Sequence, residues 1–281
     1  MDHDNRLSKG HDGVAGDARV RAWLEIREPL ERQLEPLGRA AASQLDLRPG
    51  ERVLDIGFGI GSTPFALADA VGPSGRVVGI DVLQAALDVM RADRRCSPQI
   101  SFLHGDAEMY PFAAESFDAV FSRFGVMFFS DPISAFTNIH RALRPGGRMA
   151  LVCWRRLADN QLDALPIRAA SPYLPIQLVT DAEAAGHFSF ADPDLLREML
   201  MRAGFTGIGI AEHNEEVRCG SLRAMVEVCS RVGSLGAILR EHPERRHGIL
   251  PALERALAGM DGPEGPALRA ATWVVVAQRP N

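Results

Sequence analysis

The chain has 281 residues, of which 46% are hydrophobic and 24% are charged, as in ordinary globular proteins. Its net charge is −5 and its pI is about 5.9, without the basic stripe that binds a phosphate backbone, so no nucleic-acid partner is expected. No apolar run is long enough for a membrane span, and the first 20 residues are polar, so a cytoplasmic protein without a signal peptide is expected. The four cysteines form no CxxC pair, which favours free thiols over a zinc site.

The N-terminal region divides into a tail and a helix. Residues 1–16 are rich in glycine and charge, which predicts a disordered tail. Over 17–46 the apolar residues recur at spacings of three and four, which predicts a cap helix with one packing face.

Strands and helices alternate over residues 47–155, which we assign to the cofactor-binding core. Strands separated by helices imply right-handed crossovers and a parallel sheet covered on both faces. The expected strands are 52–56, 77–80, 100–104, 117–122 and 149–154, and the expected helices are 63–71, 83–92 and 134–143, the last closed by a turn at 144–147.

The alternation stops after Trp154. Residues 156–190 have no clear period and are assigned to a cap insertion. The remainder, 191–281, is assigned to the C-terminal part of the core, with a helix over 192–203 and strands over 205–217 and 271–278.

A helical insertion is expected at 221–259 within this C-terminal part, with breaks at Gly233–Gly236 and His242–Pro243. Its apolar residues fit either the chain's own core or a partner copy, which leaves a homo-oligomer open. The expected architecture is therefore α/β, with one sheet and a helical cap over the carboxyl ends of its strands.

The stretch VLDIGFGIGS, residues 53–62, places a glycine turn directly after the first strand. Such a turn brings backbone N–H groups close to a ligand. A pyrophosphate-binding turn would carry its last glycine at the position of Ser62, and the carboxylate of Asp55 would repel a pyrophosphate. Asp55 instead fits a ligand with positive charge, and S-adenosylmethionine carries an ammonium and a sulfonium group.

Two further carboxylates follow the next strands. Asp81 ends the second strand, where a carboxylate accepts hydrogen bonds from ribose hydroxyls, in NAD and in S-adenosylmethionine alike. Val82 is placed to pack on the adenine face. Asp106, after the third strand, fits an acceptor for the adenine amino group better than the alternative, a helix N-cap before AEMY.

Residues 51–154 resemble the core of class I S-adenosylmethionine-dependent methyltransferases of the type 11 group, which includes ubiquinone and menaquinone biosynthesis methyltransferases. The resemblance implies a doubly wound, seven-stranded Rossmann-like sheet with an antiparallel last strand. The motifs that carry it stand in order and at the right spacing: VLDIGFGIGS, VVGIDV, HGDAEMYPF, FDAVFSRFGVMFFSDPISAF and RALRPGGRMALVCWR.

The resemblance also implies roles for particular residues. The methionine portion of the cofactor would be bound by Asp55 and the Gly57–Gly61 turn, the ribose by Asp81, and the adenine by the segment from Asp106 to Ala107. The methionine side would be lined by Ser122 and Arg123. The full expected cofactor set is Asp55, Gly57, Phe58, Gly59, Gly61, Asp81, Val82, Asp106, Ala107, Ser122 and Arg123.

Several of these side chains also have a purely structural interpretation. Arg123 equally fits an ion pair with a surface acid, and Trp154 fits a ligand pocket as well as the core. Met127 and the two phenylalanines after it fit the core better than a pocket. His187 is the only histidine kept as a candidate base, and no catalytic base is assigned, because in-line methyl transfer depends mainly on alignment and exclusion of water.

The function expected from these features is methyl transfer to a small molecule. The apolar stretch 162–180 suggests a partly hydrophobic acceptor. A nucleic-acid methyltransferase would need an Asn/Asp-Pro-Pro-aromatic stretch where this chain has Ser122-Arg123-Phe124-Gly125. An NAD-dependent oxidoreductase is disfavoured by Asp55, and a non-catalytic S-adenosylmethionine-binding protein stays an alternative.

Overall fold

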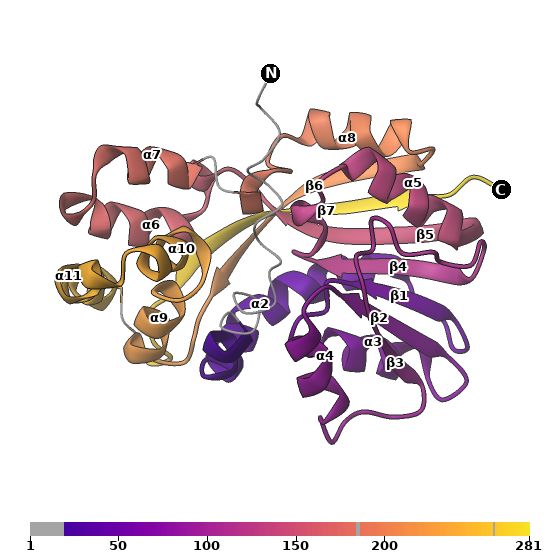
Figure 1. Ribbon diagram of the computed structural model, residues 1–281, viewed down its shortest axis with the longest axis horizontal. Coiled ribbons are helices and arrows are strands. Elements are labelled where there is room, and N and C mark those ends of the chain that lie inside the picture. The colour runs from indigo at the N-terminus through magenta and orange to yellow at the C-terminus, as the bar shows by residue number, and fades with distance from the viewer. Residues whose placement is uncertain (1–19, 184–185, 261) are drawn as a thin grey trace.

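A single seven-stranded sheet forms the centre of the computed structural model, which describes residues 20–183, 186–260 and 262–281 (Figure 1). The expected tail at 1–16 lies outside the described residues. The strand order is β3-β2-β1-β4-β5-β7-β6. The strands are β1 (Arg52–Ile56), β2 (Arg76–Asp81), β3 (Ile100–His104), β4 (Phe117–Arg123), β5 (Leu143–Trp154), β6 (Thr206–Val217) and β7 (Leu268–Gln278).

The sheet order confirms the doubly wound α/β fold. Strands β1 to β5 pair in parallel, whereas β7 runs antiparallel to both β5 and β6. The chain winds outward from β1 in one direction and from β4 in the other. The carboxyl ends of these two neighbours therefore form the crevice at which open α/β sheets bind ligands.

Two apolar clusters cover the two faces of the sheet. On one face lie α2 (Arg27–Ala42), α3 (Thr63–Val71) and α4 (Gln84–Arg91), and on the other lie α5 (Pro132–Ala142) and α8 (Pro193–Arg202). Side chains alternate along β4, so that Val120 joins the α5 side and Phe121 joins the α2 side. Both are fully buried, as expected for a central parallel strand.

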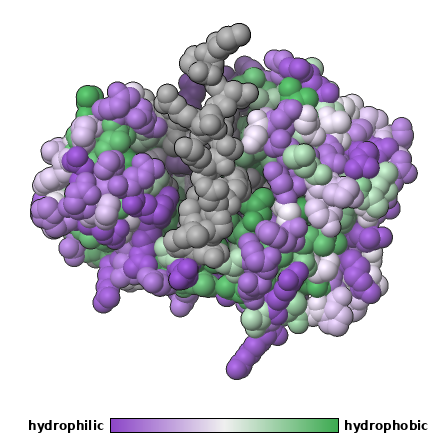
Figure 2. Space-filling view, viewed as in Figure 1, coloured by the Kyte–Doolittle hydropathy of each residue, from purple (hydrophilic) through white to green (hydrophobic). Residues whose placement is uncertain are grey.

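A third apolar cluster lies beside the sheet, around the long outer ends of β6 and β7 (Figure 1). Hydrophilic side chains cover most of its visible outer surface in Figure 2, so its apolar residues face inward. None of the described helices is long and apolar enough to cross a membrane. The helices of this cap are α6 (Gln161–Ala170), α7 (Ile176–Glu183), α9 (Leu222–Cys229), α10 (Gly233–Glu241) and α11 (Arg246–Ala258).

Most element boundaries lie within a few residues of expectation, and three differences change the local structure. The helix expected over 17–46 is interrupted by a turn at 25–26, so α2 begins only at Arg27. The turn expected at 144–147 is part of β5, where an irregularity shifts the pairing with β4 and Gly146 adopts φ +71°. The helix break expected at Gly233–Gly236 lies before Gly233, because Gly233 is the first residue of α10.

Candidate cofactor site

The glycine turn lies at the carboxyl end of β1, opposite the start of the segment that follows β4. Gly57 and Gly59 adopt φ values of +70° and +55°, which L side chains rarely tolerate. A Cβ on Gly57 would lie 2.7 Å from Cα of Gly125, so two chain segments touch there. A Cβ on Gly59 would meet none of the described atoms within 4 Å, so this part of the turn presents its backbone to open space.

Asp55 is a buried carboxylate that lacks a partner. Its side chain is on β1, the residue is only 1% exposed, and its Oδ2 has no hydrogen-bond partner among the described residues. Burial raises the pKa of Asp55 to about 8, with Asp81 and Glu31 adding to the rise and Arg123 opposing it. An unpaired polar group of this kind is costly unless a ligand satisfies it, and a cation is the natural ligand.

Asp81 joins the end of β2 to the glycine turn. Its Oδ2 accepts a hydrogen bond from the backbone N–H of Gly59 at 2.8 Å, and its Oδ1 accepts one from that of Leu83 at 2.9 Å. Burial raises its pKa, against the effect of these hydrogen bonds. Each carboxylate oxygen retains a second lone pair, so Asp81 can both support the turn and accept hydrogen bonds from a ligand.

The expected adenine residues follow β2 and β3. Val82 is half-buried, and its carbonyl lies 3.0 Å from Nε2 of His104. Asp106 is exposed, and its Oδ1 accepts a hydrogen bond from the N–H of Glu108 at 2.9 Å, which closes a local turn. Ala107 is buried and its carbonyl accepts from Asn138 at 3.0 Å. Their contacts with adenine stay a prediction.

Phe58 and Ser122 contribute side chains to the framework beneath the turn. The Phe58 ring packs on Phe102 with centroids 4.9 Å apart, so this side chain anchors the turn to the neighbouring strand β3. Ser122 is fully buried, and its hydroxyl donates to the carbonyl of Ile56 at 2.8 Å and accepts from the N–H of Gly125 at 3.3 Å. Ser122 thus connects the ends of β1 and β4, and its predicted contact with the cofactor stays a prediction.

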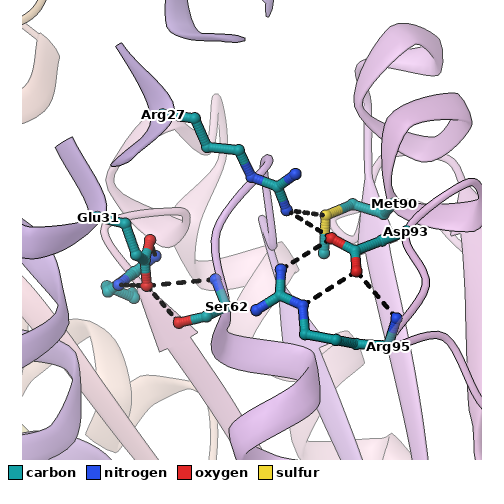
Figure 3. Close-up of polar contacts among 7 residues, drawn as sticks. Arg27, Glu31, Ser62, Met90, Asp93 and Arg95 are labelled. Carbon is teal, nitrogen blue, oxygen red and sulfur yellow. Dashed lines mark hydrogen bonds and ion pairs between the residues drawn. The ribbon is translucent and has the colours of Figure 1, made fainter. Parts of the chain in front are cut away.

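Arg123 forms an ion pair with an acid, which was one of its two interpretations. The pair is largely buried, whereas an acid at the surface was expected. Its Nη1 and Nη2 donate to the two oxygens of Glu31 at 3.0 and 2.8 Å, and the two side chains are 10% and 23% exposed. Glu31 also accepts from the backbone N–H of Ser62 at 3.2 Å and from the Ser62 hydroxyl (Figure 3). Burial acts to raise the pKa of Glu31, but the contacts with Arg123 and Ser62 lower it overall.

Sequence reasoning missed Glu31, because no local motif marks it. It lies one turn into α2, 31 residues before the serine that it contacts. A groove of about 790 Å³ runs along α2 next to Glu31 and reaches Gly61 and Ser62, without including Asp55 or Asp81. On the same side Asp93 accepts hydrogen bonds from Arg27 at 3.0 Å and Arg95 at 2.8 Å (Figure 3).

Aromatic residues follow the ends of β4 and β5. Phe124 adopts φ +60°, and its ring stacks on Trp154 with centroids 4.1 Å apart and planes inclined by 10°. Trp154 packs against all three apolar clusters. Met127 is buried in the core, whereas Phe128 is 55% exposed. The stack therefore joins the sheet to the cap.

His187, the one histidine kept as a candidate base, lies in the cap rather than at the glycine turn. Nε2 of His187 lies 2.9 Å from Oδ2 of Asp163 and 3.3 Å from the hydroxyl of Ser234, in the cap. Asp163 also accepts from the backbone N–H of Ser234 and so caps α10. Within the described residues, no group of three or more His, Cys, Asp or Glu side chains could hold a metal ion.

Comparison with known proteins decides the family. A methyltransferase domain matches residues 54–151. Demethylmenaquinone methyltransferase of Staphylococcus epidermidis is 30% identical over 176 residues, which cover 59% of this chain and 72% of that protein. The chain belongs to the type 11 group of class I methyltransferases. This group transfers a methyl group from S-adenosylmethionine, so the predicted enzyme class and cofactor are confirmed and the oxidoreductase alternative is not supported.

Two further comparisons agree with this membership. The ubiquinone/menaquinone biosynthesis C-methyltransferase UbiE of Pseudomonas paraeruginosa is 33% identical over 170 residues, 57% of this chain and 66% of that protein. The structure of Haemonchus contortus phosphoethanolamine N-methyltransferase 2 in complex with S-adenosylmethionine has a TM-score of 0.61 at 17% identity. It covers 98% of this chain and 59% of that one, which shows a shared fold.

Proposed function

We propose that this methyltransferase binds S-adenosylmethionine at the carboxyl ends of β1, β2 and β4 and transfers the methyl group in line to a partly apolar small molecule. The observation that carries the proposal is the buried carboxylate of Asp55 at the switch point of the sheet, whose Oδ2 has no hydrogen-bond partner among the residues that the structure describes. The cofactor supplies a methyl group on positively charged sulfur, and it also carries an ammonium group. Both charges suit a carboxylate that has no cation of its own.

The surrounding residues then have complementary tasks. Asp55 faces the positive charge of the methionine portion, and the open backbone at Gly59 allows the ligand to approach the turn. Asp81 accepts hydrogen bonds from the ribose. Val82 and the segment from Asp106 to Ala107 border the adenine. Ser122 holds the β1 and β4 ends at a fixed separation, so that the site is formed before the ligand enters.

The acceptor is proposed from the cap and from the relatives. The relatives are named for demethylmenaquinone and for ubiquinone/menaquinone biosynthesis, and these are small molecules. In this chain, Leu162 and Leu178 pack only partly buried against the cap cluster, and Trp154 joins that cluster to the sheet. An apolar acceptor covered by such side chains would exclude water from the transferring methyl group.

The acceptor proposal can be tested with S-adenosylmethionine that carries an isotopically labelled methyl group. The enzyme is incubated with fractionated small-molecule extracts and, separately, with total RNA and DNA, and products are analysed by mass spectrometry. Label in an apolar small molecule is expected. Label confined to nucleic acid would contradict the proposed acceptor class.

Replacing Asp81 by alanine is expected to weaken binding of S-adenosylhomocysteine about 10- to 100-fold. The substitution removes the proposed ribose acceptor and the acceptor for the N–H of Gly59, and hydrogen bonds to charged groups contribute about 1.5–3 kcal/mol. Calorimetric titration measures the change. The exposed Asp88→Ala, on the adjacent helix α4, serves as control and should bind like the wild type. Unchanged affinity of Asp81→Ala would contradict the assignment.

A further inference from the structure

The side chain of Arg123 is enclosed between α2 and the glycine turn. A Cβ on Gly38 of α2 would lie 2.6 Å from Cδ of Arg123, and a Cβ on Gly61 would lie 2.1 Å from its Nη2. A larger residue at either position would clash with the Arg123 side chain, so glycine at both leaves room for it. The guanidinium therefore has a defined place, at the last glycine of the turn.

Glu31 holds the guanidinium in that place. Each oxygen of its carboxylate accepts one hydrogen bond from Arg123, a bidentate geometry that fixes direction as well as distance. The same carboxylate accepts from the backbone and hydroxyl of Ser62, at the N-terminus of α3. Glu31 is thus fully hydrogen-bonded, while Asp55 nearby keeps an oxygen without a partner.

The charged groups around Asp55 decide how strongly Arg123 acts on it. Among the described residues, the groups that act on Asp55 are two acids, Asp81 from β2 and Glu31 from α2, and one cation, Arg123 from β4. Arg123 forms its ion pair with Glu31. Arg123 is the cation that acts on Asp55 among the described residues, whereas Glu31 also acts on Arg95.

We propose that Glu31 is a positioning residue for the cofactor site: it holds Arg123 against Gly61 and offsets its charge, so that Asp55 stays available for the positive charge of the cofactor. The inference rests on the proposed function, because it assumes that the cofactor's ammonium group faces Asp55. Without the Glu31 carboxylate, the full charge of Arg123 would act on Asp55 and compete with the ligand.

The proposal predicts a specific pH dependence. In the wild type, Asp55 titrates near pH 8 before binding, so binding of S-adenosylhomocysteine at pH 7 should release close to one proton and strengthen as the pH rises from 6 to 8, where the ligand keeps its ammonium charge. In Glu31→Gln, the unopposed charge of Arg123 lowers the pKa of Asp55. Proton release at pH 7 should then largely disappear, and affinity should change little with pH.

Calorimetric titrations with S-adenosylhomocysteine from pH 6 to pH 8, in buffers of different ionisation enthalpy, measure affinity and proton release together. At pH 8 Glu31→Gln should bind about tenfold more weakly than the wild type. The control Glu35→Gln removes a half-buried acid of the same helix that pairs with Arg39, and it should behave as the wild type. If Glu31→Gln lost affinity by the same factor at every pH and released as many protons as the wild type, Glu31 would only hold α2 against the turn. That result would overturn the proposal.

The double variant Glu31→Gln/Arg123→Gln separates the two explanations further. Removal of the competing cation should restore proton release at pH 7 and recover affinity at pH 8. If Glu31 served only to hold α2 against the turn, the second substitution would restore neither. A double variant as flat in pH as Glu31→Gln would overturn the proposal. A wild-type protein that does not bind S-adenosylhomocysteine would instead contradict the proposed function itself.

Discussion

Replacement of Asp55 by asparagine is expected to weaken S-adenosylhomocysteine binding about 100-fold and, at the same time, to stabilise the protein without ligand at alkaline pH. The loss of affinity follows from removal of the only proposed carboxylate partner of the cofactor's positive charge, since a charged hydrogen bond contributes up to about 3 kcal/mol. The gain in stability follows from burial, because asparagine keeps the shape of the side chain and carries no charge.

The sign of the pH effect follows from the direction of the shift. The pKa of Asp55 rises from 3.8 to about 8 on folding, so its stabilising contribution is complete below about pH 3.8 and is lost as the pH rises through about 8. The melting temperature of the ligand-free wild type should therefore fall between pH 6 and pH 9. In Asp55→Asn that fall should be smaller by about 5 °C or more.

Thermal denaturation and calorimetric titration measure the two effects in parallel. The matched control is Asp69→Asn, an exposed acid on α3, for which neither quantity should change. Equal affinities of Asp55→Asn and the wild type would contradict the role of this carboxylate. A melting temperature with the same pH dependence in both proteins would show that Asp55 is already ionised at pH 6 in the folded state, so that its pKa is not raised to about 8.

The second large effect is expected for Gly59→Val, which should abolish detectable cofactor binding while the protein remains folded. The backbone at Gly59 has φ +55°, so a side chain costs on the order of 1–3 kcal/mol. No described atom lies within 4 Å of the new Cβ, so the first carbon of the side chain meets no neighbour. The valine would instead occupy the open space from which the ligand approaches the turn.

Circular dichroism and calorimetric titration separate folding from binding in this variant. Gly207→Val is the control, because Gly207 has φ +59° and a Cβ there would meet only the side chain of Gln278, at 3.5 Å or more. Gly207 lies in the edge strand β6, where β6 is paired to the end of β7. Both variants should be folded, and only Gly59→Val should lose binding; retained binding would mean that the turn does not approach the cofactor.

The sequence predicted the core well because its signals are local. Thr63–Val71 and Ile100–His104 match the structure residue for residue, since glycines, apolar runs and Ser62 mark their ends. The parallel core followed from the alternation of strands and helices, and the doubly wound seven-stranded sheet with its antiparallel last strand followed from the family resemblance. The positive φ values of Gly57 and Gly59 agree with the interpretation of the turn as a ligand-facing segment.

The remainder depends on tertiary contacts that no local pattern reveals. Pro166 obscured α6, although the structure accommodates it within that helix. The partner of Arg123 could not be chosen from sequence, because Glu31 reaches it only when α2 packs across the end of β4. For the same reason the charge state of Asp55, which depends on Glu31, Asp81 and Arg123 together, could be anticipated only in outline.

The central claim is that a carboxylate at the glycine turn selects a cationic cofactor over a pyrophosphate. Calorimetric titration of the purified protein with S-adenosylhomocysteine, S-adenosylmethionine and NAD in parallel tests this claim most directly. We expect micromolar binding of the first two, with proton release at pH 7, and no binding of NAD. Binding of NAD alone would contradict the account and would require a purely structural explanation for Asp55.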